Sequence, residues 1–261
     1  MKNTLRIPTK DPYAYIEMEY EGKPEEAIAE YNRVTALIKG GVTDELYERV
    51  HTFTGEVILY DKVNHRYKSE AGVTLIGGSA YKKSLDKPFP LGSARKAVAK
   101  KSGVSEADIA DMWERNRDMS ANLGTALHLA MEQWFKHRNN STDKNYHLPK
   151  HPFLQNAVLT FPRKNDIGHA EIFVSDIEKK RVGQVDLLVA VPKKPYVLVD
   201  YKTDADIARN LSGHFNQLSF YAHILKDKGF PVETLEVWNY TDTWTLYNSP
   251  VLDIIDNQTI A

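Results

Sequence analysis

Two short apolar runs joined by a turn are the feature that most limits how this chain can fold. The runs Val185–Val191 and Tyr196–Val199 are rich in Val and Leu and flank the turn sequence Pro-Lys-Lys-Pro. Turn residues between two β-prone runs predict a hairpin of two buried strands. Each strand also carries a carboxylate, Asp186 or Asp200, where a core strand is expected to be apolar.

A lysine beside the second carboxylate completes a chemical pattern. Side chains alternate along a strand, so Asp200 and Lys202 are expected to point one way and Tyr201 the other. Two carboxylates supply hard oxygen ligands for Mg²⁺ or Mn²⁺. Such a metal acidifies water and screens a phosphate, while an ammonium can orient the attacking water. The pattern therefore indicates metal-assisted hydrolysis.

The alternative is that both carboxylates are charges at strand ends, paired with nearby lysines. We favour the metal site because both carboxylates interrupt strongly apolar strands. A buried carboxylate is costly unless a partner or a metal compensates it.

Composition narrows the classes of partner and cofactor. The chain has 261 residues, 34 Lys and Arg, 35 Asp and Glu, and no cysteine. Any positive charge that contacts nucleic acid must therefore be local. The lack of cysteine excludes disulfides, Cys-ligated zinc and an iron–sulfur cluster, and it fits a reducing compartment such as the cytoplasm. Without a secretory signal or an apolar run of roughly twenty residues, we expect no membrane association.

The local basic stretch lies at residues 82–101. It contains Lys82, Lys83, Lys87, Arg95, Lys96, Lys100 and Lys101. Such a run is either a solvated face or a patch that follows a phosphate backbone, and the residues alone do not separate the two. Under the second interpretation Arg95, Lys96, Lys100 and Lys101 contact nucleic acid.

Apolar residues at three- and four-residue steps predict a long helix over Ser105–Arg138. Ser105 and Asp108 resemble a capping box at its start. Gly124 in its middle predicts close approach of another backbone or a kink. His128 lies at the edge of the apolar stripe, and helical periodicity alone indicates a histidine with one structural hydrogen bond.

Other elements follow from period and turn signals. We predict helices over Pro24–Lys39, Thr43–Val50 and Pro152–Leu159, short strands within residues 55–81, a strand over His169–Val174, a helix over Leu211–Lys228, and strands over Leu235–Tyr240 and Thr243–Tyr247. On the helix that follows the central hairpin, Gln217 and Tyr221 are one turn apart and share a face.

Five short motifs occur in order: GTALH (124–128), HAE (169–171), GQVD (183–186), DYK (200–202) and QLSFYA (217–222). The set resembles the RecB-like branch of the PD-(D/E)XK nuclease superfamily. It is similar to the nuclease domains of RecB and AddB, the CRISPR-associated RecB-like exonucleases, the mitochondrial genome-maintenance exonuclease and many phage nucleases. Each motif is weak alone, but five in order within a strand–turn–strand–helix context are specific.

The resemblance implies roles for residues at matching positions. Asp186 and Asp200 would bind the metal together with His128 and the backbone carbonyl of Tyr201, and Lys202 would be the catalytic lysine. The remaining matching positions are Glu171, the acidic residue one strand earlier, and Gln217 and Tyr221, which would line the cleft and contact substrate or lysine. Val185 replaces the usual proline, and Asp200 stands where many relatives have Glu.

The resemblance also implies a fold and a reaction. The fold would be α/β, a mixed central sheet flanked by helices, with residues 105–261 as nuclease core and residues 1–104 as an N-terminal accessory region or DNA-contacting arm. The function would be Mg²⁺- or Mn²⁺-dependent hydrolysis of DNA, as an exonuclease on ends or single strands in the cytoplasm of a bacterial or phage-infected cell. A structure-selective endonuclease and an inactive DNA-binding module are the alternatives.

Overall fold

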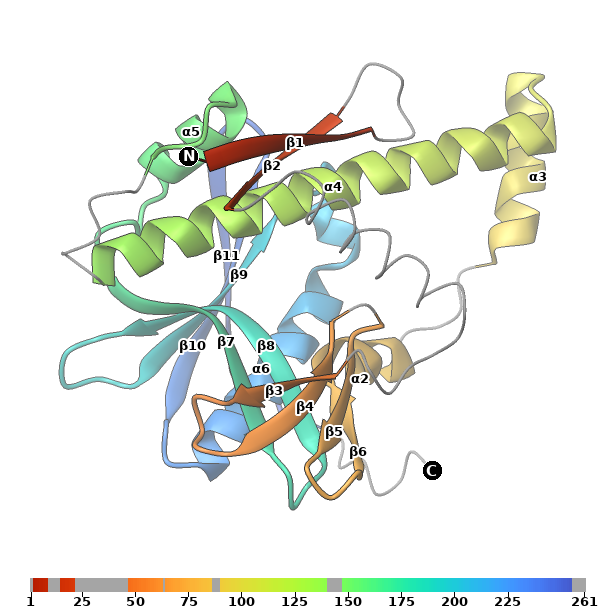
Figure 1. The fold of residues 1–261 in the computed structure, drawn as a ribbon. Coiled ribbons are helices and arrows are strands. Elements are labelled where there is room, and N and C mark those ends of the chain that lie inside the picture. The colour runs from red at the N-terminus through yellow and green to blue at the C-terminus, as the bar shows by residue number, and fades with distance from the viewer. Residues whose placement is uncertain are drawn as a thin grey trace. The chain divides into compact units, whose positions relative to one another are not determined.

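The computed structural model describes residues 2–8, 15–21, 47–62, 64–85, 90–139 and 147–254 (Figure 1). The chain divides into two compact units, Met1–Arg49 with Leu59–Arg66, and Val50–Ile58 with Tyr67–Ala261. This division differs from the predicted boundary between residues 104 and 105, because residues 67–104 belong to the larger unit. The predicted helix Pro24–Lys39 lies outside the described residues.

The smaller unit includes an antiparallel pair, β1 (Lys2–Pro8) and β2 (Tyr15–Glu21). The boundary between the units passes through β3 (Tyr47–His51), β4 (Val57–Asp61) and β5 (Arg66–Ser69). The predicted helix over Thr43–Val50 is wrong where it can be checked, since Tyr47–Val50 is strand. Tyr and Val favour strands once a pairing partner is present, and the short run carries no apolar stripe that would hold a helix.

The larger unit is built on a mixed sheet. Its strands include β6 (Thr74–Gly77), β7 (Ile167–Asp176), β8 (Arg181–Ala190), β9 (Tyr196–Lys202), β10 (Val232–Tyr240) and β11 (Trp244–Pro250). Neighbours run in the order β11-β10-β9-β8-β6-β5, and β7 also pairs with β8. The β9–β10 and β6–β8 pairs are parallel, whereas β7–β8, β8–β9 and β10–β11 are antiparallel. The central hairpin is therefore confirmed as β8 and β9.

Helices flank this sheet, which confirms the predicted α/β class. They are α2 (Gly78–Leu85), α3 (Leu91–Ser102), α4 (Glu106–Asn139), α5 (Pro152–Thr160) and α6 (Leu211–Asp227), with a short 3₁₀ turn at Ile207–Arg209. Ser105 caps α4 as predicted, because its Oγ accepts from the Asp108 N–H at 3.1 Å; in place of the second bond of a capping box, Ser105 Oγ donates to the Asp108 carboxylate at 2.6 Å. None of the helices in the described ranges has a stretch long and apolar enough to cross a lipid bilayer.

The two faces of the sheet bury separate apolar cores. Leu198 of β9 packs with the residues of α6, whereas Val197 and Val199 pack with those of α4 and α5. Tyr201 continues the second face. Strand alternation then places Asp200 on the face of Leu198, as predicted from the period of two.

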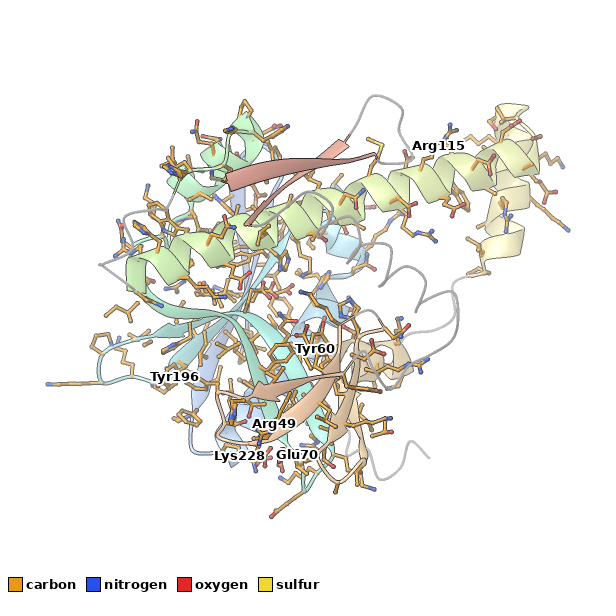
Figure 2. The ribbon with its side chains drawn as sticks, viewed as in Figure 1. Arg49, Tyr60, Glu70, Arg115, Tyr196 and Lys228 are labelled. Carbon is orange, nitrogen blue, oxygen red and sulfur yellow. The ribbon has the colours of Figure 1, made fainter. Side chains whose placement is uncertain are left out.

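Helix α4 runs along the sheet in its C-terminal half and extends past it in its N-terminal half, where α3 packs against it (Figure 1). Arg115 lies on this extending part (Figure 2). The fully buried residues Leu127, Met131 and Phe135 belong to the half that covers the sheet. His128 therefore sits where α4 meets the sheet.

Tyr221 of α6 packs its ring into a space formed by two glycines. A Cβ atom added to Gly183 of β8 would lie 2.0 Å from Tyr221 Cε1, and one added to Gly78 of α2 would lie 2.3 Å from that atom. Real Cβ atoms do not approach so closely, so both glycines are required by the aromatic ring. These contacts bring α2, α6 and β8 together around Tyr221.

We expect Gly183→Ala to lower the free energy of unfolding by about 1–3 kcal/mol, because the added methyl overpacks against Tyr221. In a Tyr221→Ala background the same change should cost far less, since the ring is gone. Chemical denaturation of the double-mutant cycle measures the coupling. Gly92→Ala is the matched control, because a Cβ there meets nothing within 4 Å. Equal costs for Gly183→Ala in both backgrounds would contradict the packing assignment.

Candidate functional site

The candidate site forms where β8 and β9 separate. Leu187–Val189 pair with Val197–Val199. The same register would next bring Asp186 opposite Asp200, but the paired segment ends before that position. Instead, the backbone N–H of Tyr201 donates to Asp186 Oδ2 at 2.8 Å. A side-chain carboxylate thus replaces a carbonyl as the partner of this N–H, and it is held at the opening between the strands.

Strand β7 is irregular at the residue opposite Asp186. Ala170 pairs with Leu187 and Ile172 with Val185, which leaves Glu171 opposite Asp186 without a ladder partner. Glu171 has a φ of 50°, in the left-handed region. A side chain in this region costs about 1–2 kcal/mol relative to ordinary backbone conformations. The strain thus falls on the residue of β7 whose carboxylate contacts His128 and Gln184.

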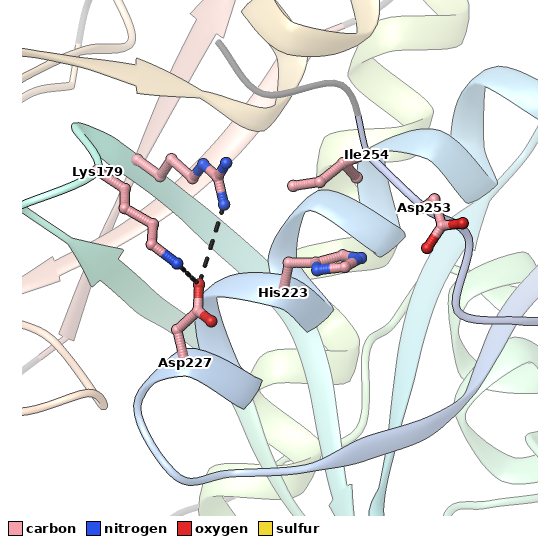
Figure 3. Close-up of a pocket in the computed structure, with 6 residues that line it drawn as sticks. Lys179, His223, Asp227, Asp253 and Ile254 are labelled. Atoms are coloured by element: carbon pink, nitrogen blue, oxygen red, sulfur yellow. Dashed lines mark hydrogen bonds and ion pairs between the residues drawn. The ribbon is translucent and has the colours of Figure 1, made fainter. Parts of the chain in front are cut away.

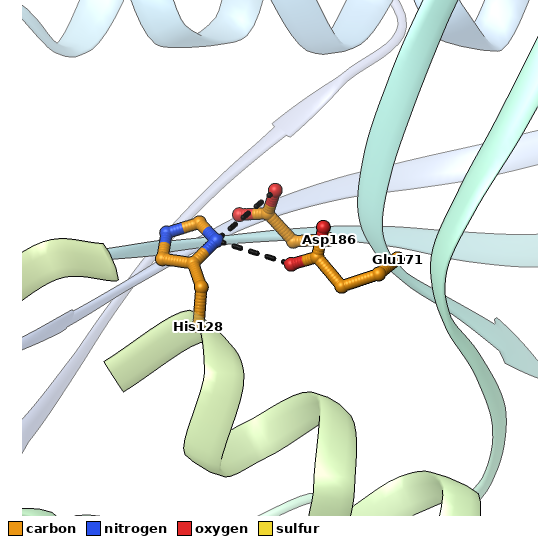
Figure 4. Close-up of side chains that lie close together, drawn as sticks. All are labelled: His128, Glu171 and Asp186. Atoms are coloured by element: carbon orange, nitrogen blue, oxygen red, sulfur yellow. Dashed lines mark hydrogen bonds and ion pairs between the residues drawn. The ribbon is translucent and has the colours of Figure 1, made fainter. Parts of the chain in front are cut away.

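His128 reaches this gap from α4. Its Nδ1 lies 3.3 Å from Glu171 Oε1 and 3.5 Å from Asp186 Oδ1 (Figure 4). Its Nε2 lies 3.1 Å from the backbone oxygen of Tyr201. One ligand atom from each of His128, Glu171 and Asp186 lies within 4.8 Å of the others. The histidine therefore faces the carboxylates and has more partners than the single hydrogen bond predicted from periodicity alone, while its role as a metal ligand stays a prediction.

Asp200 and Lys202 adjoin this cluster. Lys202 Nζ donates to Asp200 Oδ1 at 2.6 Å and to the Tyr201 carbonyl at 2.9 Å. The carbonyl of Tyr201 thus contacts both Lys202 and His128. Asp200 itself is outside the three-residue cluster and is joined to it through Lys202. Its Oδ2 is buried and makes no hydrogen bond to the described residues.

Burial and neighbouring charges shift the pKa values of His128 and Asp186. Burial alone would lower the pKa of His128, but the carboxylates of Asp186 and Glu171 outweigh it and raise this pKa to about 9. Burial raises the pKa of Asp186 to about 7, although the positive charges of His128 and Lys202 oppose the shift. Both groups therefore hold protons more tightly than they would in an unfolded chain.

Asp200 and Lys202 form an ion pair. Burial opposes ionisation of Asp200, but Lys202 and His214 overcome it and lower the pKa of this carboxyl. Burial also opposes the charge on Lys202, while Asp200 and Asp186 raise the pKa of its ammonium. Lys202 thus remains an ammonium that donates hydrogen bonds.

Gln217 and Tyr221 share a face of α6, as predicted. Gln217 Nε2 donates to the Tyr221 hydroxyl at 2.9 Å and to Ser79 Oγ at 3.2 Å. Together with the glycine contacts of Tyr221, these bonds connect α6 to the start of α2. Neither bond reaches Lys202 or the carboxylates, so the predicted contact of these two residues with substrate or lysine stays a prediction.

Of the two alternatives predicted for Gly124, close approach of another backbone is wrong. A Cβ atom there would lie 3.7 Å from Thr203 Oγ1, which is an ordinary van der Waals distance. Packing against the sheet does not require glycine at this position.

Sequence reasoning missed three residues near the site. Gln184 Nε2 donates to Glu171 Oε2 at 2.8 Å. His214 Nδ1 lies 3.6 Å from Asp200 Oδ2 and 3.5 Å from Lys82 Nζ. Helical spacing offered a signal for His214, since it precedes Gln217 by three residues and so shares its face. Strand alternation offered a signal for Gln184, which precedes Asp186 by two residues on the same strand, and Lys82 was noted only as part of the basic stretch.

The predicted nucleic-acid-binding residues lie on α3. Lys96, Lys100 and Lys101 are exposed, and Arg95 is half-buried. Exposure fits either a solvated face or a contact with phosphates, so this interpretation stays a prediction.

A separate hollow of about 320 Å³ lies at the far end of α6 (Figure 3). It is lined by Lys179, Arg181, His223, Asp227, Asp253 and Ile254. Asp227 Oδ2 lies 2.6 Å from Lys179 Nζ and 4.0 Å from Arg181. None of the residues predicted for the metal site lines this hollow.

The chain matches no protein-family model and no curated protein sequence.

The positive φ of Glu171 predicts that glycine at this position is more stable than alanine, the opposite of the usual order in a strand. We expect Glu171→Gly to be more stable than Glu171→Ala by about 1 kcal/mol, because only glycine adopts positive φ without steric cost. In an unstrained strand the order is the opposite. Chemical denaturation without metal measures the difference, and an Ala variant at least as stable as the Gly variant would contradict the backbone assignment.

The raised pKa of His128 gives a pH dependence. From pH 6.5 to about 9 the folded protein holds a proton on this ring that the unfolded chain has lost. The stability of metal-free protein contributed by His128 is therefore present below pH 6.5 and is lost as pH rises towards 9. In EDTA, the melting temperature of wild type minus that of His128→Gln should decrease as pH rises from 6.5 to about 9. A constant difference would contradict the assignment.

Proposed function

We propose that this chain is a divalent-metal-dependent DNA nuclease of the RecB-like branch of the PD-(D/E)XK superfamily. We further propose that it is an exonuclease acting on DNA ends or single strands. The observation that carries the proposal is the meeting of His128, Glu171 and Asp186 at the opening of the β8–β9 hairpin, beside the Asp200–Lys202 pair. These side chains come from four motifs spread over residues 124–202.

The donor set fits a hard divalent cation. Carboxylates, a backbone carbonyl and an imidazole suit Mg²⁺ and Mn²⁺. Asp186, Asp200, His128 and the Tyr201 carbonyl would hold the ion, with Glu171 beside them. The buried Oδ2 of Asp200 supports this proposal, because a carboxylate oxygen without a hydrogen bond is costly unless a cation compensates it. A bound ion would neutralise phosphate charge and lower the pKa of a bound water.

Lys202 has a role that follows from its contacts. Two of its donors are directed to Asp200 and to the Tyr201 carbonyl, and an ammonium has three. The third N–H is available to orient a water or to stabilise charge on a phosphate oxygen. Because Asp200 keeps Lys202 protonated, the lysine acts as a donor and not as a base.

The exposed lysines of α3 would supply affinity for the substrate. Phosphate contacts by Lys and Arg bind without regard to sequence and release counterions. In a chain with 34 basic and 35 acidic residues, Arg95, Lys96, Lys100 and Lys101 form one of the local concentrations of positive charge.

The test is incubation of the protein with end-labelled linear DNA and with covalently closed circular DNA in Mg²⁺. We expect loss of linear DNA, abolition by EDTA, and recovery with Mg²⁺ or Mn²⁺. Asp186→Ala and Asp200→Ala should lose cleavage by orders of magnitude while they keep their fold. Their melting temperature without metal should fall while they stay folded, because Asp186→Ala removes the acceptor of the Tyr201 N–H and Asp200→Ala removes the carboxylate that pairs with Lys202.

Other outcomes separate the alternatives. Nicking of closed circles would assign an endonuclease of the same fold. DNA binding without cleavage at any metal concentration would assign a binding module. Full activity in EDTA would end the metal mechanism.

A further inference from the structure

Gln184 controls which oxygen of Glu171 faces the metal-ligating cluster. Its Nε2 donates to Glu171 Oε2 at 2.8 Å, while Glu171 Oε1 lies 3.3 Å from His128 Nδ1. Gln184 is on β8, two residues before Asp186, and the register pairs it with Phe173 of β7. The two oxygens of one carboxylate are thus directed to different partners.

The backbone of Glu171 limits this carboxylate further. The positive φ of 50° fixes the direction of the side chain, and the hydrogen bond from Gln184 fixes rotation of its carboxylate. The side chain is largely shielded from solvent, with 13% of its surface exposed. Glu171 therefore directs Oε1 towards His128 while Gln184 holds Oε2, and this hydrogen bond resists the turn of the carboxylate that would bring both oxygens to one ion.

The number of oxygens that a carboxylate presents matters for the choice of ion. Mg²⁺ requires six ligands in near-ideal octahedral positions at about 2.1 Å, which suits carboxylates that give one oxygen each. Ca²⁺ accepts six to eight oxygens at about 2.3–2.6 Å and is often bound by both oxygens of one carboxylate. A carboxylate locked to one oxygen therefore favours the smaller ion.

We propose that Gln184 is a positioning residue that makes the site selective for Mg²⁺ and Mn²⁺ over Ca²⁺ by holding Glu171 to a single ligating oxygen. The proposal rests on the metal centre of the proposed function and concerns which ion binds. It is tested by metal binding without DNA, so its outcome does not depend on cleavage.

The test compares wild type with Gln184→Met, which keeps the side-chain length and removes the N–H donor. Isothermal titration with Mg²⁺, Mn²⁺ or Ca²⁺ alone, and melting-temperature titrations with the same ions, give the affinities. Residues that orient metal ligands typically change metal affinity by about 10–100-fold. We expect Mg²⁺ and Mn²⁺ binding to weaken by at least about tenfold, with Ca²⁺ binding unchanged or tighter.

Gln155→Met is the matched control, because Gln155 is exposed on α5 and the chemical change is the same. Gln184→Asn is a second variant: it keeps the amide but is one methylene too short, and it should shift the selectivity in the same direction if Gln184→Met does not fold. An unchanged ratio of Ca²⁺ to Mg²⁺ affinity in a folded variant would overturn the proposal, as would a wild type that binds none of these ions. A wild type that binds Mg²⁺ selectively but cleaves no DNA would overturn the proposed nuclease and leave the role of Gln184 standing.

Discussion

The hydrogen bond from the Tyr201 N–H to Asp186 Oδ2, at 2.8 Å, is the contact on which the rest of the site depends. It takes the place of a ladder bond where β8 and β9 stop pairing. A buried backbone N–H without an acceptor is costly. The need for an acceptor pairs strands in a sheet, and at this position it holds the Asp186 carboxylate in place of a strand carbonyl. This bond anchors Asp186 beside the Tyr201 carbonyl, which contacts both His128 and Lys202, so polar side-chain and backbone atoms line the opening between the strands.

The elements with strong period or turn signals were predictable from sequence. The β8–β9 hairpin, α4 and α6 follow from runs of Val and Leu, a capped apolar stripe and helical spacing, and the shared face of Asp200 and Lys202 follows from strand alternation. Helices α2 and α3 were not predicted, because both are short and few apolar residues mark a face; the buried residues are Gly78 and Tyr81 in α2 and Ala99 in α3. Both depend on tertiary contacts that no local pattern encodes.

Some contacts of the site also follow from local sequence patterns, and others do not. His128 lies 43 residues before Glu171 and 73 before Tyr201, and periodicity says nothing about contacts across such separations. The family resemblance predicted that His128 lies near the acidic residues, and in the structure its imidazole contacts Glu171 and Asp186. The positive φ of Glu171 and the bond from Gln184 lay beyond both kinds of reasoning, since Glu is not a residue that marks left-handed backbone.

The charges of the cluster are partly balanced by groups of the chain itself, and this sets a condition on the proposed cation. Glu171, Asp186 and Asp200 bring three carboxylates together, and the ammonium of Lys202 balances one of them. The raised pKa of His128 favours an imidazolium that offsets a second carboxylate, and the raised pKa of Asp186 favours retention of its own proton. A metal ligates neutral imidazole and ionised carboxylate, so binding must displace these protons. The acidic groups are thus compensated by protons in the free protein and would be compensated by the ion in the bound one, which keeps the buried charge low in both states.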